Sequence, residues 1–249
     1  MAEMLKVSRL CKFFGGIKAI NDLTLSVQPG QFLGIIGANG AGKTTLLNLI
    51  TGYLAPTSGT ITFEGRPIHG MPPYRIARLG IGRTFQITQP FAEMSVLENV
   101  MAGALFSEYG RHRTLEQARE DSLGPLKLVG LDGQASMLAG ALTLGAKKKL
   151  ELARALATRP RLLLLDEVMG GLTHEEVEDL MVVLRRIHKS GMTIVMIEHL
   201  VHVIVELSDY VFAMNFGMEL AQGLPESVIE SPEVIEAYLG VPIETGDAK

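Results

Sequence analysis

Apolar and polar residues alternate in two short stretches of the N-terminal part of the chain. The alternation covers residues 23–27 and again 60–64, and Pro or Gly residues bound both stretches. A period of two is typical of strands that bury one face and expose the other. We therefore expect half-exposed antiparallel strands in this part of the chain.

Three other stretches are apolar almost throughout, namely 31–36, 161–166 and 192–197. Such runs are typical of parallel strands that are buried on both faces of a sheet. A capping-box pattern begins at Thr173, between the second and third runs, and apolar residues follow it at helical spacing: Val177, Leu180, Leu184 and Ile187. A helix that joins two buried strands predicts a right-handed crossover and a three-layer α/β core.

The middle of the chain, from about 86 to 158, changes character. Thr114 opens a capping-box pattern with Gln117, and helix-compatible sequence follows to about Val129. A lysine-rich stretch, 147–149, is interpreted as the solvated face of another helix, because the chain as a whole is acidic. We therefore expect a mainly helical insert here.

The C-terminal part returns to strands. A strand pair is predicted after Asp209, with its turn at 215–217, and a helix then ends near Gly240. The sequence shows no internal repeat and no Pro/Ser-rich linker. We therefore expect a single domain over 1–249, in which a helical subdomain, about 87–158, interrupts a core formed by 1–86 and 159–249.

Composition limits the class of protein further. The 249 residues are 47% hydrophobic and 20% charged, which is enough apolar material for a substantial folded core. The net charge of -4 gives no general attraction to nucleic acid. The single cysteine, Cys11, excludes a disulfide framework within the chain and suits a reducing compartment. We see neither a secretory signal nor an apolar run of the roughly 20 residues that span a bilayer, so we expect a cytoplasmic location.

The first candidate site is a glycine-rich loop that fits the pattern G-x-x-x-x-G-K-[ST]. It follows the buried run at 31–36 and precedes a credible helix start, which are the two contexts that the pattern requires. Backbone N–H groups of such a loop surround phosphate oxygens, the lysine reaches the outer phosphates, and the hydroxyl of Thr44 can bind Mg²⁺. The candidate nucleotide-binding residues are Gly37, Ala38, Asn39, Gly40, Ala41, Gly42, Lys43, Thr44 and Thr45.

Two carboxylates form the second candidate site. Asp166 and Glu167 end the apolar run at 161–166. The carboxyl ends of parallel strands form the edge at which open α/β sheets bind ligands. A lone Asp-Glu pair is usually a solvated strand end, but the phosphate loop favours the chemical interpretation. We assign Asp166 to the metal, directly or through water, and Glu167 to polarising the water that attacks the phosphate.

With these motifs in this order, the chain resembles the nucleotide-binding subunits of ABC transporters over nearly its whole length. Three further residues match the pattern of that family, namely Phe14, Gln86 and His199. The resemblance implies that Phe14 stacks on adenine, that Gln86 senses the metal, the water and the membrane partner, and that His199 contacts the γ-phosphate. It also implies ATP and Mg²⁺ as cofactors, and a P-loop NTPase (RecA-like) core with an antiparallel β subdomain and a helical insert.

The signature segment of the family, ideally L-S-G-G-Q, corresponds here to 142–146 and departs from that pattern. The resemblance implies that the signature of one subunit faces the γ-phosphate held by the other. Thr143 keeps a hydroxyl and Gly145 keeps close backbone approach, whereas Ala146 lacks the amide side chain. Thr173 replaces the Asp or Asn that is usual before the next helix, although it can still cap that helix. Two interpretations stay open: an asymmetric heterodimer with a better-matched second ATP-binding subunit, which we favour, or a homodimer that cycles normally.

The stretch 80–91, with 94–100, is similar to importers of branched-chain amino acids and of related amides such as urea. The segments 221–226 and 237–240 agree, although lipopolysaccharide-exporter ATPases share much of that ending. The resemblance implies membrane-spanning permease subunits as partners, a substrate-binding protein indirectly, no nucleic acid, and a peripheral position on the inner face of the cell membrane. The alternatives are a lipopolysaccharide-type exporter ATPase, a soluble ABC protein acting on DNA or ribosomes, and a non-hydrolytic nucleotide-gated scaffold.

Overall fold

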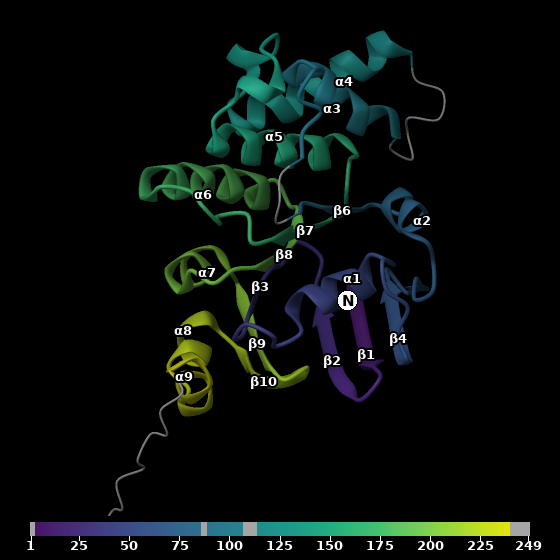
Figure 1. Ribbon diagram of the computed structural model, residues 1–249, viewed down its shortest axis with the longest axis vertical. Helices are drawn as coiled ribbons and strands as arrows, with labels where there is room; N and C mark the ends of the chain where they lie inside the picture. Colours follow the sequence, from purple (N-terminus) through teal and green to yellow (C-terminus); the bar gives the residue numbers. More distant parts are fainter. Residues whose placement is uncertain (1–2, 86–88, 107–113, 240–249) are drawn as a thin grey trace, which may run out of the picture.

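The structure is a computed structural model that describes residues 3–85, 89–106 and 114–239. Its centre is a six-stranded sheet in the order β10-β9-β3-β8-β7-β6 (Figure 1). The five strands from β9 to β6 run parallel, and β10 pairs with β9 antiparallel. The strands are β3 (Phe32–Ile36), β6 (Ile81–Arg83), β7 (Leu162–Asp166), β8 (Thr193–Ile197), β9 (Tyr210–Asn215) and β10 (Met218–Gly223).

The three apolar runs form β3, β7 and β8, and every residue of these strands is buried. Successive residues face opposite sides of the sheet. Leu163 and Leu165 of β7 belong to the core shared with the helices between residues 96 and 189, whereas Leu162 and Leu164 belong to the core on the other side. The helix α6 (His174–Lys189) joins β7 to β8 and begins at the capping box of Thr173. The predicted three-layer α/β arrangement is confirmed.

The half-exposed strands form a second sheet, which is antiparallel and has the order β2-β1-β4-β5. The helix α1 lies between the two sheets, because its buried side chains share one apolar cluster with both. The sequence pattern does not predict β1, in which register shifts interrupt the alternation of buried and exposed residues. The elements are β1 (Leu5–Phe14), β2 (Ile17–Val27), α1 (Lys43–Ile50), β4 (Ser58–Phe63) and β5 (Arg66–Pro67).

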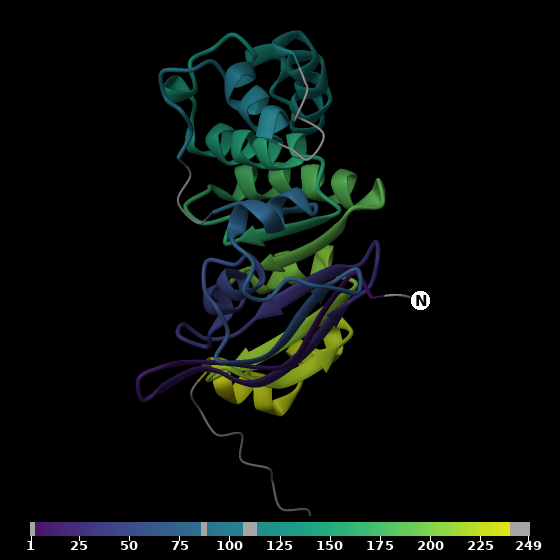
Figure 2. The same cartoon turned by 90° about the vertical axis from the view of Figure 1, so that its right-hand side faces the viewer.

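A group of helices occupies one end of the molecule, at the top of Figures 1 and 2 and away from the antiparallel sheet. Thr114 caps α4 through a capping box with Gln117, as predicted. Gly103 of α3 packs directly on α5, since a β-carbon there would lie 2.4 Å from the carbonyl oxygen of Arg154. The elements are α2 (Pro73–Arg78), α3 (Val96–Phe106), α4 (Leu115–Val129), η2 (Asp132–Gln134), η3 (Ala139–Ala141) and α5 (Leu144–Ala157).

One prediction outside the sheets needs correction. Lys148 is buried on α5, where its charge lies beside that of Glu151, so the solvated face predicted for 147–149 is wrong at this residue. The helices of the C-terminal part are α7 (Val201–Leu207), α8 (Pro225–Ile229) and α9 (Pro232–Leu239). The predicted strand pair with its turn at 215–217 is confirmed by β9 and β10, and the helix predicted to end near Gly240 is confirmed by α9, which ends at Leu239; a short additional helix, α8, precedes it.

Within the described ranges, no helix combines the length and the apolar character needed to cross a bilayer. The longest of the helices described above, α6, carries charged residues in its first and last turns.

Candidate nucleotide-binding site

The loop 37–44 leads from the end of β3 into α1 at the carboxyl edge of the central sheet. Its outer glycines are required by their surroundings. A β-carbon on Gly37 would lie 2.3 Å from the carbonyl oxygen of Met214, and one on Gly42 would lie 2.5 Å from that of Ala19. Gly42 also has φ 101°, in the left-handed region that favours glycine. The two glycines therefore fix the path of the loop against β2 and β9.

The side chain of Lys43 turns back into this loop. Its ammonium donates hydrogen bonds to the carbonyl oxygens of Gly37 at 2.6 Å and Ala38 at 3.1 Å, and the residue is only 5% exposed. Burial lowers the pKa of Lys43, and the carboxylates of Glu167 and Asp166 oppose that shift. The positive charge of Lys43 therefore lies within reach of the loop and of both carboxylates.

Glu167 lies across a hollow from the loop. The hollow has a volume of about 330 Å³, and both Glu167 and residues 39–45 line it. Glu167 has φ 50°, a conformation that residues other than glycine rarely adopt and that is often found at functional sites. Its Oε1 atom lies 2.5 Å from Nε2 of His199. The structure thus brings Glu167 and His199 together beside the loop.

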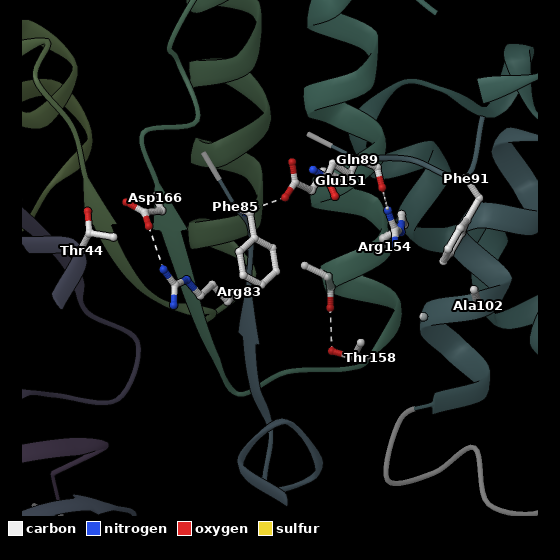
Figure 3. A pocket seen from close by; sticks show the side chains of 12 residues that line it. Thr44, Arg83, Phe85, Gln89, Phe91, Ala102, Glu151, Arg154, Thr158 and Asp166 are labelled. Carbon is white, nitrogen blue, oxygen red and sulfur yellow. Dashed lines mark hydrogen bonds and ion pairs between the residues drawn. The ribbon is translucent and has the colours of Figure 1, made fainter. Parts of the chain in front are cut away.

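Asp166 carries the second carboxylate of the site. It is 3% exposed, and its Oδ2 accepts a hydrogen bond from Nη2 of Arg83 at 2.9 Å. Its Oδ1 is buried and has no hydrogen-bond partner. Thr44 and Asp166 line the same cavity, which has a volume of about 720 Å³ (Figure 3). A buried carboxylate oxygen and a hydroxyl at one cavity are the hard oxygen donors that suit Mg²⁺.

A metal site built from this chain alone is not present in the part of the molecule that the structure describes. Across 3–85, 89–106 and 114–239, no group of three His, Cys, Asp or Glu side chains could hold an ion. Mg²⁺ is commonly bound by one or two carboxylates together with substrate phosphates and water. Thr44 and Asp166 therefore fit an ion that takes its remaining ligands from a nucleotide.

Glu198 belongs to the site although the sequence patterns did not single it out. It is 2% exposed, and its carboxylate oxygens accept hydrogen bonds from the N–H groups of Met169 at 2.8 Å and His199 at 3.3 Å. It thereby ties the turn after Glu167 to the segment that carries His199. The sequence feature that could have identified Glu198 is its position directly after the buried run of β8, which corresponds to the position of Glu167 directly after β7.

Replacing Glu198 with alanine is expected to lower the free energy of unfolding by about 1–3 kcal/mol, because the N–H groups of Met169 and His199 lose their acceptor. Glutamine keeps an acceptor and no charge, so its effect is expected to be smaller. Burial raises the pKa of Glu198 above its ordinary value of 4.5. The wild type therefore loses stability as pH rises from that value toward the folded-state pKa, and Glu198→Gln lacks this loss.

Urea denaturation of the three proteins across this pH window measures both effects. Equal stability of Glu198→Gln and Glu198→Ala would contradict the role of Glu198 as a hydrogen-bond acceptor for the two segments. An identical pH dependence of wild type and Glu198→Gln would contradict the raised pKa.

Arg83 is the second site residue that the sequence patterns did not assign. Its Nη1 donates to Oδ1 of Asn48 at 2.8 Å and to Oγ1 of Thr51 at 2.9 Å, while its Nη2 donates to Asp166. The side chains of this ion pair are 7% and 4% exposed. One guanidinium thus connects the end of α1 to the end of β7. In the sequence, the stretch 80–91, which contains Arg83, indicated only a similarity to importers of branched-chain amino acids.

Some predicted residues lie away from these cavities. Phe14, at the end of β1, is 46% exposed and lies under the ammonium of Lys12, and it is not among the residues that line the hollow beside the loop. Thr143 caps α5, and Gly145 is buried against Glu176. Among the described lining residues of both cavities, neither Thr143 nor Gly145 occurs. Gln86 lies outside the described residues.

Comparison with known proteins gives a consistent result. Residues 20–170 match the family model described as ABC transporter, and residues 219–243 match the model described as Branched-chain amino acid ATP-binding cassette transporter. The high-affinity branched-chain amino acid transport ATP-binding protein BraF of Pseudomonas aeruginosa is 38% identical over an alignment that covers 95% of this chain and 98% of that protein.

Solved structures agree with the sequence matches. An ATP-binding cassette of an ABC transporter in its ADP conformation superposes with a TM-score of 0.86 at 31% identity, over 97% of this chain and 100% of that one. A dimeric bacterial ABC transporter cassette superposes with a TM-score of 0.80 at 26% identity, over 89% of this chain and 99% of that one. The chain therefore belongs to the ABC transporter family, as one of its ATP-binding and ATP-hydrolysing subunits.

Proposed function

We propose that this chain binds Mg·ATP at the loop 37–44 and hydrolyses it to drive an importer of branched-chain amino acids. The observation that carries the nucleotide chemistry is the buried, unpartnered Oδ1 of Asp166, which shares a cavity with Thr44. The cargo is inferred from the match over 219–243 and from the similarity to BraF. The cargo itself binds elsewhere, in a substrate-binding protein and in the membrane subunits.

The loop 37–44 binds the phosphates of the nucleotide, whereas the carboxylates of Asp166 and Glu167 act on the metal and on the attacking water. The backbone N–H groups of 37–44 surround the phosphates, and the ammonium of Lys43 exchanges its carbonyl partners for outer phosphate oxygens. Thr44 and Asp166 would hold Mg²⁺, which would supply neutralisation of the charge on the phosphates. Glu167 polarises the attacking water. Nε2 of His199 lies 2.5 Å from Oε1 of Glu167, and His199 contacts the γ-phosphate. Adenine would stack on Phe14, and the family resemblance gives Gln86, which lies outside the described residues, the role of sensing the metal and the water.

A second ATP-binding subunit completes the site. Thr143 and Gly145 lie at the N-terminus of α5, where unpaired N–H groups favour a negative charge. We place this helix end against the γ-phosphate held by the other subunit. Ala146 lacks the amide side chain of the signature pattern, which supports a heterodimer with unequal sites. Equal turnover at both sites of the complex would contradict this asymmetry and favour a homodimer.

A groove between the core and the helical insert is the proposed docking surface for the permease subunits. Tyr53, Tyr74 and Phe85 expose 56%, 57% and 43% of their surface, and all three line this region. Exposed aromatic groups of this kind are enriched at protein interfaces. The groove is the hollow of about 410 Å³, and it shares Arg83, Phe85, Ala155 and Thr158 with the adjoining cavity of about 720 Å³ that Thr44 and Asp166 line.

Copurification from membranes tests the proposed function. We expect the tagged chain to recover membrane-spanning permease subunits and a second ATP-binding subunit, and the complex to hydrolyse ATP faster when a binding protein loaded with leucine is added. Phe85→Asp should lose the permease subunits, because it replaces an exposed aromatic ring of the groove with a charge. Leu224→Asp is the matched control, since Leu224 is 67% exposed and lies outside the groove. Recovery of the chain without any membrane subunit would contradict the proposal.

A further inference from the structure

We propose that Arg83 is a positioning residue that transmits occupancy of the groove to the carboxylate of Asp166. The inference rests on the proposed function, because it takes a permease segment as the occupant of the groove. Figure 3 shows the order of the groups: Thr44 and Asp166 lie on one side of Arg83, and Phe85 lies on the other.

On the nucleotide side, Arg83 determines how Asp166 is oriented. The bond from Nη2 to Oδ2 occupies one carboxylate oxygen and leaves Oδ1 buried without a partner. The bonds from Nη1 to Asn48 and Thr51 fix the plane of the guanidinium against α1. A partner that orients a metal-binding carboxylate affects metal affinity strongly. A shift of Arg83 would therefore move Oδ1, which is the oxygen available to Mg²⁺.

On the groove side, the same guanidinium contacts two exposed rings. Its Cζ lies 5.2 Å from the ring centroid of Phe85 and 5.9 Å from that of Tyr53. The two rings also contact each other edge to face, with centroids 6.1 Å apart. Both rings line the hollow of about 410 Å³. A segment seated in the groove would contact these rings and, through them, Arg83.

The helical insert holds Phe85 as well. The N–H of Phe85 donates a 2.5 Å hydrogen bond to Oε1 of Glu151, which lies on α5 (Figure 3). The backbone beside Arg83 is therefore attached to the helix whose N-terminus carries Thr143 and Gly145. Movement of the insert relative to the core would displace Phe85 and change its contact with the guanidinium.

Arg83 also has an unused donor. Its Nε is buried and has no hydrogen-bond partner, a state that is costly for a charged group. A groove occupant that changes the position of the rings can offer this N–H an acceptor or expose it to water. Two positions of Arg83 would then differ in their affinity for the occupant, which is the requirement for coupling between two sites.

The test uses the complete complex with its permease subunits and Arg83→Lys. Lysine keeps a positive charge near Asp166. It lacks the guanidinium N–H groups that donate to Asn48 and Thr51, and it lacks the planar group that contacts the rings of Tyr53 and Phe85. We expect the concentration of Mn²⁺ needed for half-maximal ATP binding, measured by titration calorimetry in place of Mg²⁺, to rise about 10-fold. We also expect the stimulation of ATP hydrolysis by the loaded binding protein to fall about 10-fold.

Arg161→Lys is the matched control for this substitution. Arg161 pairs with Glu64, and its Cζ lies 5.4 Å from the ring centroid of Phe63, so it makes the same two kinds of contact away from the site and the groove. We expect wild-type Mn²⁺ dependence and stimulation in Arg161→Lys. Equal effects of Arg161→Lys and Arg83→Lys would overturn the inference.

Phe85→Leu tests the groove side independently, because it leaves Arg83 and Asp166 in place. We expect it to lose stimulation to the same extent as Arg83→Lys, and the double variant to lose no more than either single variant, since coupled residues are not additive. If both single variants keep the stimulation of ATP hydrolysis, or if their losses of stimulation add in the double variant, the inference is overturned while the proposed function stands. A wild-type complex that shows no stimulation would contradict the proposed function, and the inference with it.

Discussion

Replacing Glu167 with glutamine is expected to slow ATP hydrolysis by about 10²- to 10⁴-fold while ATP affinity stays close to that of the wild type. The carboxylate shares the hollow with residues 39–45, and its Oε1 lies 2.5 Å from Nε2 of His199. Glutamine has nearly the same size but cannot accept a proton from the attacking water. Single-turnover hydrolysis and equilibrium binding of ATP, measured on the same preparation, separate the chemical step from binding.

The matched control for this prediction is Glu175→Gln. Glu175 lies in the first turn of α6, is exposed, and is not among the described residues that line either cavity at the site. We expect wild-type hydrolysis from this variant. Unchanged hydrolysis in Glu167→Gln would contradict the role of Glu167. Loss of ATP binding in Glu167→Gln would instead show that its carboxylate mainly supports the backbone conformation at φ 50°.

Lys43→Ala should weaken ATP binding by about 10- to 100-fold, because a hydrogen bond to a charged group contributes roughly 1.5–3 kcal/mol. The ammonium lies inside the loop, 2.6 Å from the carbonyl oxygen of Gly37, and is nearly inaccessible to water. Titration calorimetry with ATP measures the loss directly.

The control for Lys43→Ala is Lys6→Ala, since Lys6 is an exposed lysine that pairs with Glu3 on the antiparallel sheet. We expect its ATP affinity to match that of the wild type. Equal ATP affinities of Lys43→Ala and the wild type would show that the loop binds phosphate through its backbone alone. The two site variants should therefore differ in kind, since Lys43→Ala loses binding and Glu167→Gln loses turnover.

The sequence predicted the core of the fold well because burial on both faces leaves a strong local pattern. The apolar runs at 31–36, 161–166 and 192–197 became β3, β7 and β8 within one residue of their ends. The capping boxes at Thr114 and Thr173 were equally informative, since each depends on residues three apart. β1 was missed because its register shifts against β2 and β4 break the period of two.

The site was predicted only where its residues are neighbours in sequence. The loop 37–44 and the pair Asp166-Glu167 are contiguous, so their patterns are visible in one chain segment. Arg83 binds Asp166 across 83 positions of sequence, and that contact depends on β6 lying next to β7. Glu198 likewise gains its importance from the turn at Met169, 29 positions away. Such contacts follow from the sheet order, which local patterns do not contain.

The signature segment illustrates the same limit. The sequence identified the departure from L-S-G-G-Q at 142–146, and the structure adds that the hydroxyl of Thr143 caps α5 by accepting from the N–H of Ala146. The cap explains why a hydroxyl suits position 143 within one subunit. The contribution of this helix end to a second subunit depends on contacts between chains, which single-chain patterns do not contain, and it therefore stays a proposal.

Transport measured in proteoliposomes tests the central proposal most directly, since it requires nucleotide hydrolysis, the permease and the cargo together. The complete complex, with ATP on the side of the ATP-binding subunits, should accumulate radiolabelled leucine when the binding protein is present. The complex that carries Glu167→Gln should bind ATP but accumulate almost none. Leucine uptake that continues at the wild-type rate in Glu167→Gln, or a wild-type complex that hydrolyses ATP without moving leucine, would contradict the account.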